Sequence, residues 1–212
     1  MTDARTLPRL FETSADKFAA SVQMLEKRGD RYEGTTYAEM RVLVHRFAAG
    51  LLSLGLEKGD RVALLSEGRN DWVIAELGIL YCGAVDVPIS VKIDELSDLK
   101  FRLLHSGCKM AIVSQSQVGK IRPIKNDLPE LKLTIVLDTL KAFETDELSA
   151  ATVSKKGEEF LLHSRPAFEA RWQSVTEADP ANICYTSGTT ADPKGIILTT
   201  ATTRPTSSRA WP

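Results

Sequence analysis

The chain lacks the cysteine patterns of disulfide-bonded and zinc-binding proteins. It has three cysteines, Cys82, Cys108 and Cys184, an odd number with no CxxC pair among them. Each lies in or beside an apolar segment, which predicts free, buried thiols in a reducing compartment. No activating base lies near any of them in the sequence, so we do not expect a catalytic thiol.

Histidine is equally scarce. His45, His105 and His163 stand singly within helix-like segments. A metal site needs ligands clustered at recognisable spacing, and these three are not clustered. We therefore predict structural roles for all three and no protein-ligated metal.

Excess charge and long apolar runs are also absent. The 27 basic and 28 acidic residues give a net charge of −1, so no basic face points to nucleic acid. The longest apolar stretch, residues 72–88, is interrupted by Glu76 and Asp86 and is too short to span a bilayer. The amino-terminal residues contain no apolar signal core. We expect a soluble, cytoplasmic protein without a transmembrane segment, which leaves a peripheral membrane contact open.

The amino-terminal third shows helical patterns. Apolar residues recur at helical spacing from Leu7 to Leu25, which predicts a first amphipathic helix. Residues 31–37 look like a short hairpin. Thr36 and Glu39 then form a capping box that opens a helix running to about residue 54, closed by Gly55.

Short, wholly apolar strands alternate with helices through the middle of the chain. We predict strands at residues 61–65, 84–88, 110–113 and 133–137. Helices are predicted at 70–81, capped by Asn70, and at 94–106, and residues 139–171 read as a mostly helical outer segment. This alternation predicts an α/β fold with a mainly parallel sheet and helices on both faces.

The most informative segment is a hydroxyl- and glycine-rich turn at residues 185–195, Tyr-Thr-Ser-Gly-Thr-Thr-Ala-Asp-Pro-Lys-Gly. It separates two strand-like apolar runs, whereas flexible Ser/Thr/Gly linkers, the alternative, seldom do so. Backbone N–H groups and hydroxyls of such a turn can face one anion, and Gly188 allows close approach of the backbone. Lys194 adds a mobile positive charge suited to a phosphate chain. The turn matches neither GxxxxGK[ST] nor GxGxxG.

This turn resembles the phosphate-binding signature of the adenylate-forming enzymes, the superfamily of acyl-CoA synthetases, luciferases and peptide-synthetase adenylation domains. Further landmarks of their amino-terminal domain resemble residues 36–40 (TYAEM), 59–65 (GDRVALL) and 83–88 (GAVDVP). Residues 66–72 (SEGRNDW) are most similar to the fatty acyl-CoA synthetase branch. Ala191 stands where the family usually has glycine, at a cost of about 1 kcal/mol if that position needs a positive φ.

The resemblance implies a parent enzyme that activates a carboxylic acid with ATP as an acyl-adenylate and transfers it to CoA. A long-chain fatty acid is the favoured substrate, with an aryl-CoA ligase or a peptide-synthetase adenylation domain as the competing interpretations. It also implies that Mg²⁺ arrives on the ATP phosphates, near Thr189 or Thr190. The implied ATP-phosphate-binding residues are Thr186, Ser187, Gly188, Thr189, Thr190 and Lys194.

The family elements that hold adenine, ribose and the acyl chain, and the lysine of the carboxyl-terminal domain, have no counterpart in these residues. The chain is therefore predicted to be an amino-terminal piece of the large domain of an acyl-CoA synthetase, with no complete catalytic set and inactive alone. The alternative is a non-enzymatic remnant that at most binds nucleotide phosphates weakly.

Residues 1–199 follow the family, and residues 200–212 form a tail that does not. The family continues with a His-x-Asn helix start, and restoring one base near Thr199 in a back-translation yields that continuation. We therefore predict a one-base deletion at this point. Because codon choice is free in a back-translation, a natural, polar, disordered tail remains the alternative.

Overall fold

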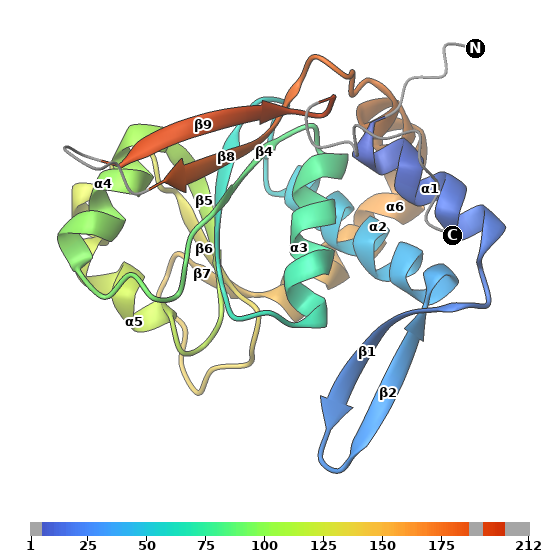
Figure 1. Ribbon diagram of the computed structural model, residues 1–212, viewed down its shortest axis with the longest axis horizontal. Helices are drawn as coiled ribbons and strands as arrows, with labels where there is room; N and C mark the ends of the chain where they lie inside the picture. The colour runs from blue at the N-terminus through green and yellow to red at the C-terminus, as the bar shows by residue number, and fades with distance from the viewer. Residues whose placement is uncertain (1–5, 187–192, 202–212) are drawn as a thin grey trace.

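The computed structural model of the protein describes residues 6–186 and 193–201 (Figure 1). Within these residues, a mainly parallel sheet forms the centre of the molecule, and β9 alone pairs with its neighbour in the antiparallel sense. The prediction of a mainly parallel α/β sheet is confirmed. Its strands are β3 (Arg61–Leu65), β4 (Val85–Pro88), β5 (Cys108–Val113), β6 (Leu133–Val136), β7 (Glu147–Ser149), β8 (Pro180–Thr186) and β9 (Lys194–Thr199), in the order β7-β6-β5-β3-β4-β8-β9.

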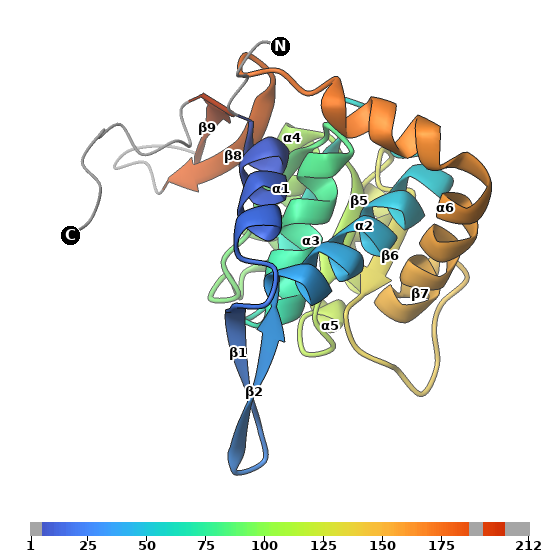
Figure 2. The same cartoon turned by 90° about the vertical axis from the view of Figure 1, so that its right-hand side faces the viewer.

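Helices cover both faces of this sheet, as predicted. One face carries α2 (Tyr37–Ser53), α3 (Asn70–Tyr81) and α6 (Ala150–Gln173), and the other carries α4 (Leu96–Ser106) and α5 (Val118–Ile121). Helix α1 (Leu7–Lys17) packs outside α2 and α3 (Figure 2). No helix among the described residues is long and apolar enough to cross a membrane.

Two hydrophobic cores result, one on each face of the sheet. Successive side chains of a strand point to opposite faces, so Val62 and Leu64 of β3 enter the core under α2 and α3, while Ala63 and Leu65 enter the core under α4. This double burial explains why apolar residues occupy consecutive positions in the central strands.

Helices α2 and α6 cross at two glycines. A Cβ atom on Gly157 would lie 1.7 Å from the carbonyl oxygen of Arg46, and one on Gly50 would lie 2.1 Å from the carbonyl oxygen of Val153. Only residues without a side chain allow the two backbones to approach this closely.

The amino-terminal segment differs from the sequence prediction. Helix α1 ends at Lys17, and Val22–Arg28 forms strand β1. This strand pairs antiparallel with β2 (Arg31–Thr36), so residues 31–36 are one arm of a projecting hairpin, not the whole of it (Figure 2). The helical prediction over residues 18–25 is wrong. A short stretch with few apolar residues is compatible with both the helical period of 3.6 and the strand period of 2.

The predicted start of α2 is confirmed, and the cap of α3 and the start of α6 differ from the prediction. The capping box is confirmed, since the Thr36 hydroxyl accepts from the Glu39 N–H at 3.3 Å and the Glu39 carboxylate accepts from the Thr36 N–H at 2.8 Å. Asn70 is the first residue of α3 and not its cap, and Arg69 takes the cap position without a side-chain hydrogen bond. Residues 147–149, predicted to lie in the outer helical segment, form the edge strand β7 ahead of α6.

Glu67 lies at the point where the connections of β3 and β5 diverge to opposite sides of the sheet. Ligands of open α/β sheets commonly bind at such a point. Here the Glu67 carboxylate accepts hydrogen bonds from the Ser116 hydroxyl and the Gln117 amide, each at 2.7 Å. A hydrogen bond from Ser114 and these two contacts lower the pKa of Glu67 to about 2. The protein's own carboxylate therefore occupies this position.

Candidate functional site

The predicted phosphate-binding turn joins β8 to β9, and the two apolar runs beside it are the predicted strands. Thr186 pairs with Lys194 at the end of the antiparallel ladder, and Tyr185 pairs with Gly195 one position behind. The side chains of Thr186 and Lys194 are exposed. The fold therefore brings these two predicted site residues together. The other predicted site residues, Ser187, Gly188, Thr189 and Thr190, lie outside the described residues, as does Ala191.

Strand β8 directs its side chains alternately into the two halves of the molecule. Ile183 and Tyr185 pack against the core under α4. Asn182 faces the other way, and its amide donates a 3.3 Å hydrogen bond to the Asp86 carboxyl group of β4. The Cys184 thiol donates to the Asn182 amide oxygen at 2.9 Å. The strand that leads into the turn is thus held from both sides of the sheet.

Asp86 is the buried partner in this arrangement. Its side chain is fully buried, and burial, together with the nearby Glu76 carboxylate, raises the pKa of Asp86 well above its ordinary value. The protonated form of Asp86 is therefore favoured relative to that of an exposed carboxyl group. Asp86 and Asn182 are also the residues that pair between the parallel strands β4 and β8.

Tyr185 reaches helix α4. Its hydroxyl oxygen lies 2.7 Å from Nδ1 of His105 and 3.2 Å from the carbonyl oxygen of Arg102. The sequence predicts a structural role for His105 and gives it no connection with the turn. No local signal could have shown this connection, because 80 residues separate the two side chains.

The cysteines behave largely as predicted. None of them forms a disulfide, Cys82 and Cys108 are buried, and Cys184 is half-buried. Burial raises the pKa of all three thiols, that of Cys108 to about 12. Such thiols stay protonated and are poor nucleophiles. Among the described residues, no group of three or more His, Cys, Asp or Glu side chains could hold a metal ion.

Comparison with known proteins gives consistent matches. The sequence model of the family described as "AMP-binding enzyme" matches residues 11–209. The long-chain-fatty-acid–CoA ligase ACSBG1 of Homo sapiens is 28% identical over 190 residues, which are 87% of this chain and 25% of that protein. The long-chain-fatty-acid–CoA ligase FadD15 of Mycobacterium bovis is 31% identical over 155 residues, 73% of this chain and 24% of that protein.

Structural comparison agrees at the level of the fold. The crystal structure of a long-chain-fatty-acid-CoA ligase (FadD1) from Archaeoglobus fulgidus aligns with a TM-score of 0.74 at 20% identity. The alignment covers 92% of this chain and 36% of that one. The chain spans about a quarter of the length of the two curated relatives.

Proposed function

Because the chain belongs to the AMP-binding enzyme family, we propose that the turn between β8 and β9 binds the phosphates of ATP. The observation that carries this proposal is the end of the ladder, where Thr186 and Lys194 face each other with exposed side chains. A hydroxyl and a cation at the two ends of one turn suit a polyphosphate, and Mg²⁺ would come with the phosphates, near Thr189 or Thr190. The full proposed set is Thr186, Ser187, Gly188, Thr189, Thr190 and Lys194.

The parent reaction is the joining of a carboxylic acid to CoA. A carboxylate oxygen attacks the α-phosphorus of ATP and pyrophosphate leaves, after which the CoA thiol attacks the acyl carbon and AMP leaves. Residues of the turn would hold the β- and γ-phosphates and stabilise the departing pyrophosphate. The names of the curated relatives support a long-chain fatty acid as the substrate. An aryl-CoA ligase or a peptide-synthetase adenylation domain is the competing parent.

This chain alone is proposed to bind nucleotide phosphates weakly and to lack ligase activity. In-line attack requires the acid, the α-phosphorus and the leaving group to be held together, and we assign no described residue to adenine, ribose, the acyl chain or CoA. Three thiols without a disulfide, two of them buried, support a cytoplasmic setting.

Titration calorimetry with Mg²⁺·ATP and Mg²⁺·pyrophosphate tests the binding proposal. We expect weak binding to the 212-residue chain, and an affinity reduced by about five-fold or more in Lys194→Ala, since charge-assisted contacts are the strong ones. Lys155→Ala, which removes an exposed lysine of α6, is the matched control and should bind like the wild type. Equal affinities of Lys194→Ala and wild type would remove Lys194 from the site.

Acid-dependent exchange between ATP and pyrophosphate separates the two function classes. An enzyme that forms an acyl-adenylate incorporates labelled pyrophosphate into ATP only when a fatty acid is present. We expect no exchange from this chain. Exchange that depends on added fatty acid would show that the chain carries out adenylation by itself.

A further inference from the structure

Tyr185 is the penultimate residue of β8, directly before Thr186, and its hydroxyl contacts a histidine of helix α4. We infer that His105 is a positioning residue for the phosphate-binding turn and acts through Tyr185. This inference rests on the proposed function, because the turn is the element that His105 would position. It assigns no contact between His105 and the nucleotide.

The hydrogen bonds around the Tyr185 hydroxyl fix which group donates. The carbonyl oxygen of Arg102 can only accept, so the Tyr185 hydroxyl donates its single hydrogen to it across 3.2 Å. The oxygen of Tyr185 must then accept from Nδ1 of His105 across 2.7 Å. His105 therefore carries a hydrogen on Nδ1, either as the neutral Nδ1–H tautomer or as the imidazolium.

Ring contacts restrict the tyrosine further. The Arg102 guanidinium lies 5.9 Å from the centre of the Tyr185 ring, and the His105 ring meets that ring edge-on with centroids 5.8 Å apart. Phe101 stacks on His105 with centroids 5.4 Å apart. The Arg102 side chain is itself fixed, since it donates to the carbonyl oxygen of Asp98 at 2.7 Å. Side chains of α4 thus contact the ring of Tyr185 as well as its hydroxyl.

Tyr185 also touches the strand that leaves the turn. It pairs with Gly195 in the ladder, and a Cβ atom on Gly195 would lie 3.4 Å from Cε1 and Cζ of the Tyr185 ring. The ring therefore lies over the β9 backbone next to Lys194. Because Tyr185 precedes Thr186 and covers Gly195, fixing this one ring fixes both ends of the turn.

A set of substitutions separates positioning from simple packing. His105→Phe keeps a ring to stack on Phe101 but removes the donor. His105→Asn keeps a donor, because its amide nitrogen occupies nearly the place of Nδ1. Tyr185→Phe removes the acceptor. His163→Phe, the same change at an exposed histidine of α6 on the opposite face of the sheet, is the control.

Backbone amide exchange by nuclear magnetic resonance gives a readout that does not depend on a ligand. In an antiparallel ladder only one of two adjacent residue pairs is hydrogen-bonded. For the amides of Tyr185, Thr186, Lys194 and Gly195 that the ladder protects, we expect exchange to rise about five-fold in His105→Phe and in Tyr185→Phe, the size of one lost hydrogen bond. His105→Asn and His163→Phe should leave these rates near those of the wild type. The nitrogen spectrum of His105 should lose its protonated Nδ1 tautomer in Tyr185→Phe.

Affinity for Mg²⁺·pyrophosphate gives the functional readout. We expect His105→Phe to bind about five-fold more weakly than wild type, and the double variant with Tyr185→Phe to show no further loss. Unchanged exchange rates in His105→Phe overturn the inference, as does unchanged affinity where the wild type binds. If the wild type does not bind pyrophosphate, the proposed function fails for this chain, and the exchange rates alone decide whether His105 positions the turn.

Discussion

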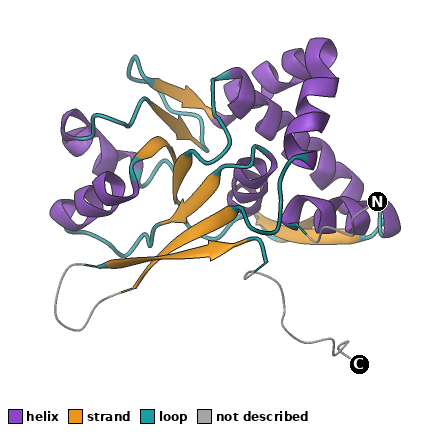
Figure 3. Cartoon of the chain, turned by 90° about the horizontal axis from the view of Figure 1, so that it is seen from above, coloured by secondary structure: helices purple, strands orange, loops and turns teal. Residues whose placement is uncertain are grey.

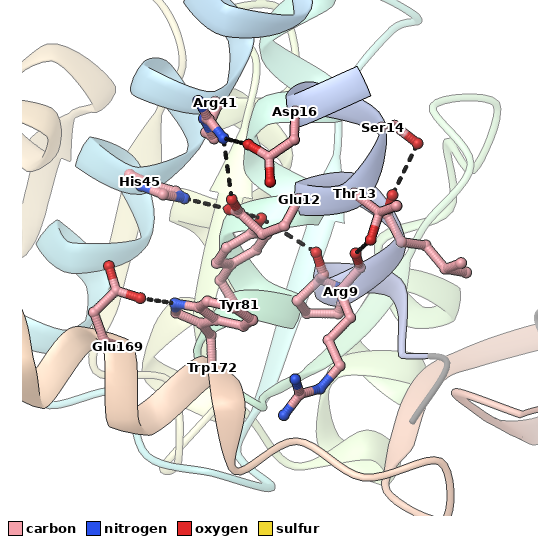
Figure 4. Close-up of polar contacts among 12 residues, drawn as sticks. Arg9, Glu12, Thr13, Ser14, Asp16, Arg41, His45, Tyr81, Glu169 and Trp172 are labelled. Atoms are coloured by element: carbon pink, nitrogen blue, oxygen red, sulfur yellow. Dashed lines mark hydrogen bonds and ion pairs between the residues drawn. The ribbon is translucent and has the colours of Figure 1, made fainter. Parts of the chain in front are cut away.

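The hydroxyl of Tyr81 donates a 2.5 Å hydrogen bond to the carboxylate of Glu12 and so joins α3 to α1 (Figure 4). Nε2 of His45, on α2, lies 2.6 Å from the same carboxylate oxygen. The Arg41 guanidinium approaches the other oxygen at 3.6 Å. Three elements far apart in the sequence therefore meet at one acidic side chain.

The protonation of Glu12 depends on this surrounding. Burial by itself would raise the pKa of Glu12, but hydrogen bonds from His45 and Tyr81 and the charge of Arg41 lower it below the ordinary value of 4.5. A carboxyl group with a lowered pKa stabilises the fold above its unfolded-state pKa. That contribution is lost as the pH falls through the folded-state pKa.

We expect Glu12→Gln to lower the free energy of unfolding by about 1–3 kcal/mol at pH 7, because Tyr81 and Arg41 lose a charged partner. Below pH 4.5 the difference from wild type should shrink. Urea denaturation at several pH values measures both effects. Asp16→Asn removes a carboxylate that is 73% exposed and also pairs with Arg41, and it should cost less than about 1 kcal/mol. Equal effects of the two substitutions would contradict the conclusion that the Glu12 carboxylate stabilises the fold through Tyr81, His45 and Arg41.

The crossing of α2 and α6 makes a second prediction. Gly157→Ala places a methyl group against the Arg46 carbonyl, and because backbone cannot move aside cheaply we expect a loss of about 3 kcal/mol or more. Gly119→Ala, in α5, meets no atom within 4 Å and should be neutral or slightly stabilising. Thermal denaturation of the pair tests this. A stable Gly157→Ala protein would mean that the helices can separate.

The pKa of Glu67 predicts an acid-dependent loss of stability. Since the pKa falls from 4.5 to about 2 on folding, the ionised carboxylate stabilises the fold above pH 4.5. This stability should disappear between pH 4.5 and 2 in the wild type and be missing in Glu67→Gln at every pH. Glu159→Gln, an exposed glutamate of α6, should keep the wild-type profile. If the free energy of unfolding changed with pH in the same way for wild type and Glu67→Gln across this range, the prediction would be refuted.

Strand β9 gives a prediction about association. It is the last strand of the described sheet (Figure 3). Ile196 and Ile197 lie on its two faces, and they are 47% and 61% exposed. Exposed edges with apolar side chains favour pairing with another chain. We expect the chain to self-associate or to unfold without a sharp transition, and Ile197→Lys to reduce the association in sedimentation velocity. A monodisperse wild-type monomer with a cooperative thermal transition would contradict this.

The sequence predicted the central architecture because double burial leaves a strong signal. Segments such as residues 62–65 and 110–113 are apolar throughout, and helices with distinct start and stop residues separate the strands. The hairpin at residues 22–36 was misread, since its apolar residues are too few to distinguish a period of two from one of 3.6. The sequence does not predict strand β7, because the three residues Glu147–Ser149 are too few to show a hydrophobic periodicity.

The sequence predicts where the candidate site lies in the chain, but not the side chains that contact the strands beside it. The order of hydroxyls, glycines and Lys194 marks the turn, and the fold places Thr186 opposite Lys194 as two flanking strands require. The side chains that contact β8 ahead of the turn, His105 and Asp86, come from elements that only the tertiary fold brings near this strand. A single sequence contains no signal for such pairs. The predicted frameshift concerns the tail, of which residues 202–212 lie outside the described part of the chain, so it stays a prediction.

The antiparallel sense of β9 fixes the direction in which the backbone leaves this region. After Thr199 the chain is held beside the start of β8, where the Thr200 and Ala201 N–H groups donate to Asp179 and Glu177. That point lies a strand length of about 20 Å from the turn. A fluorophore or surface tether attached at Ala201 itself would therefore sit at the end of the β8–β9 hairpin that lies away from the turn.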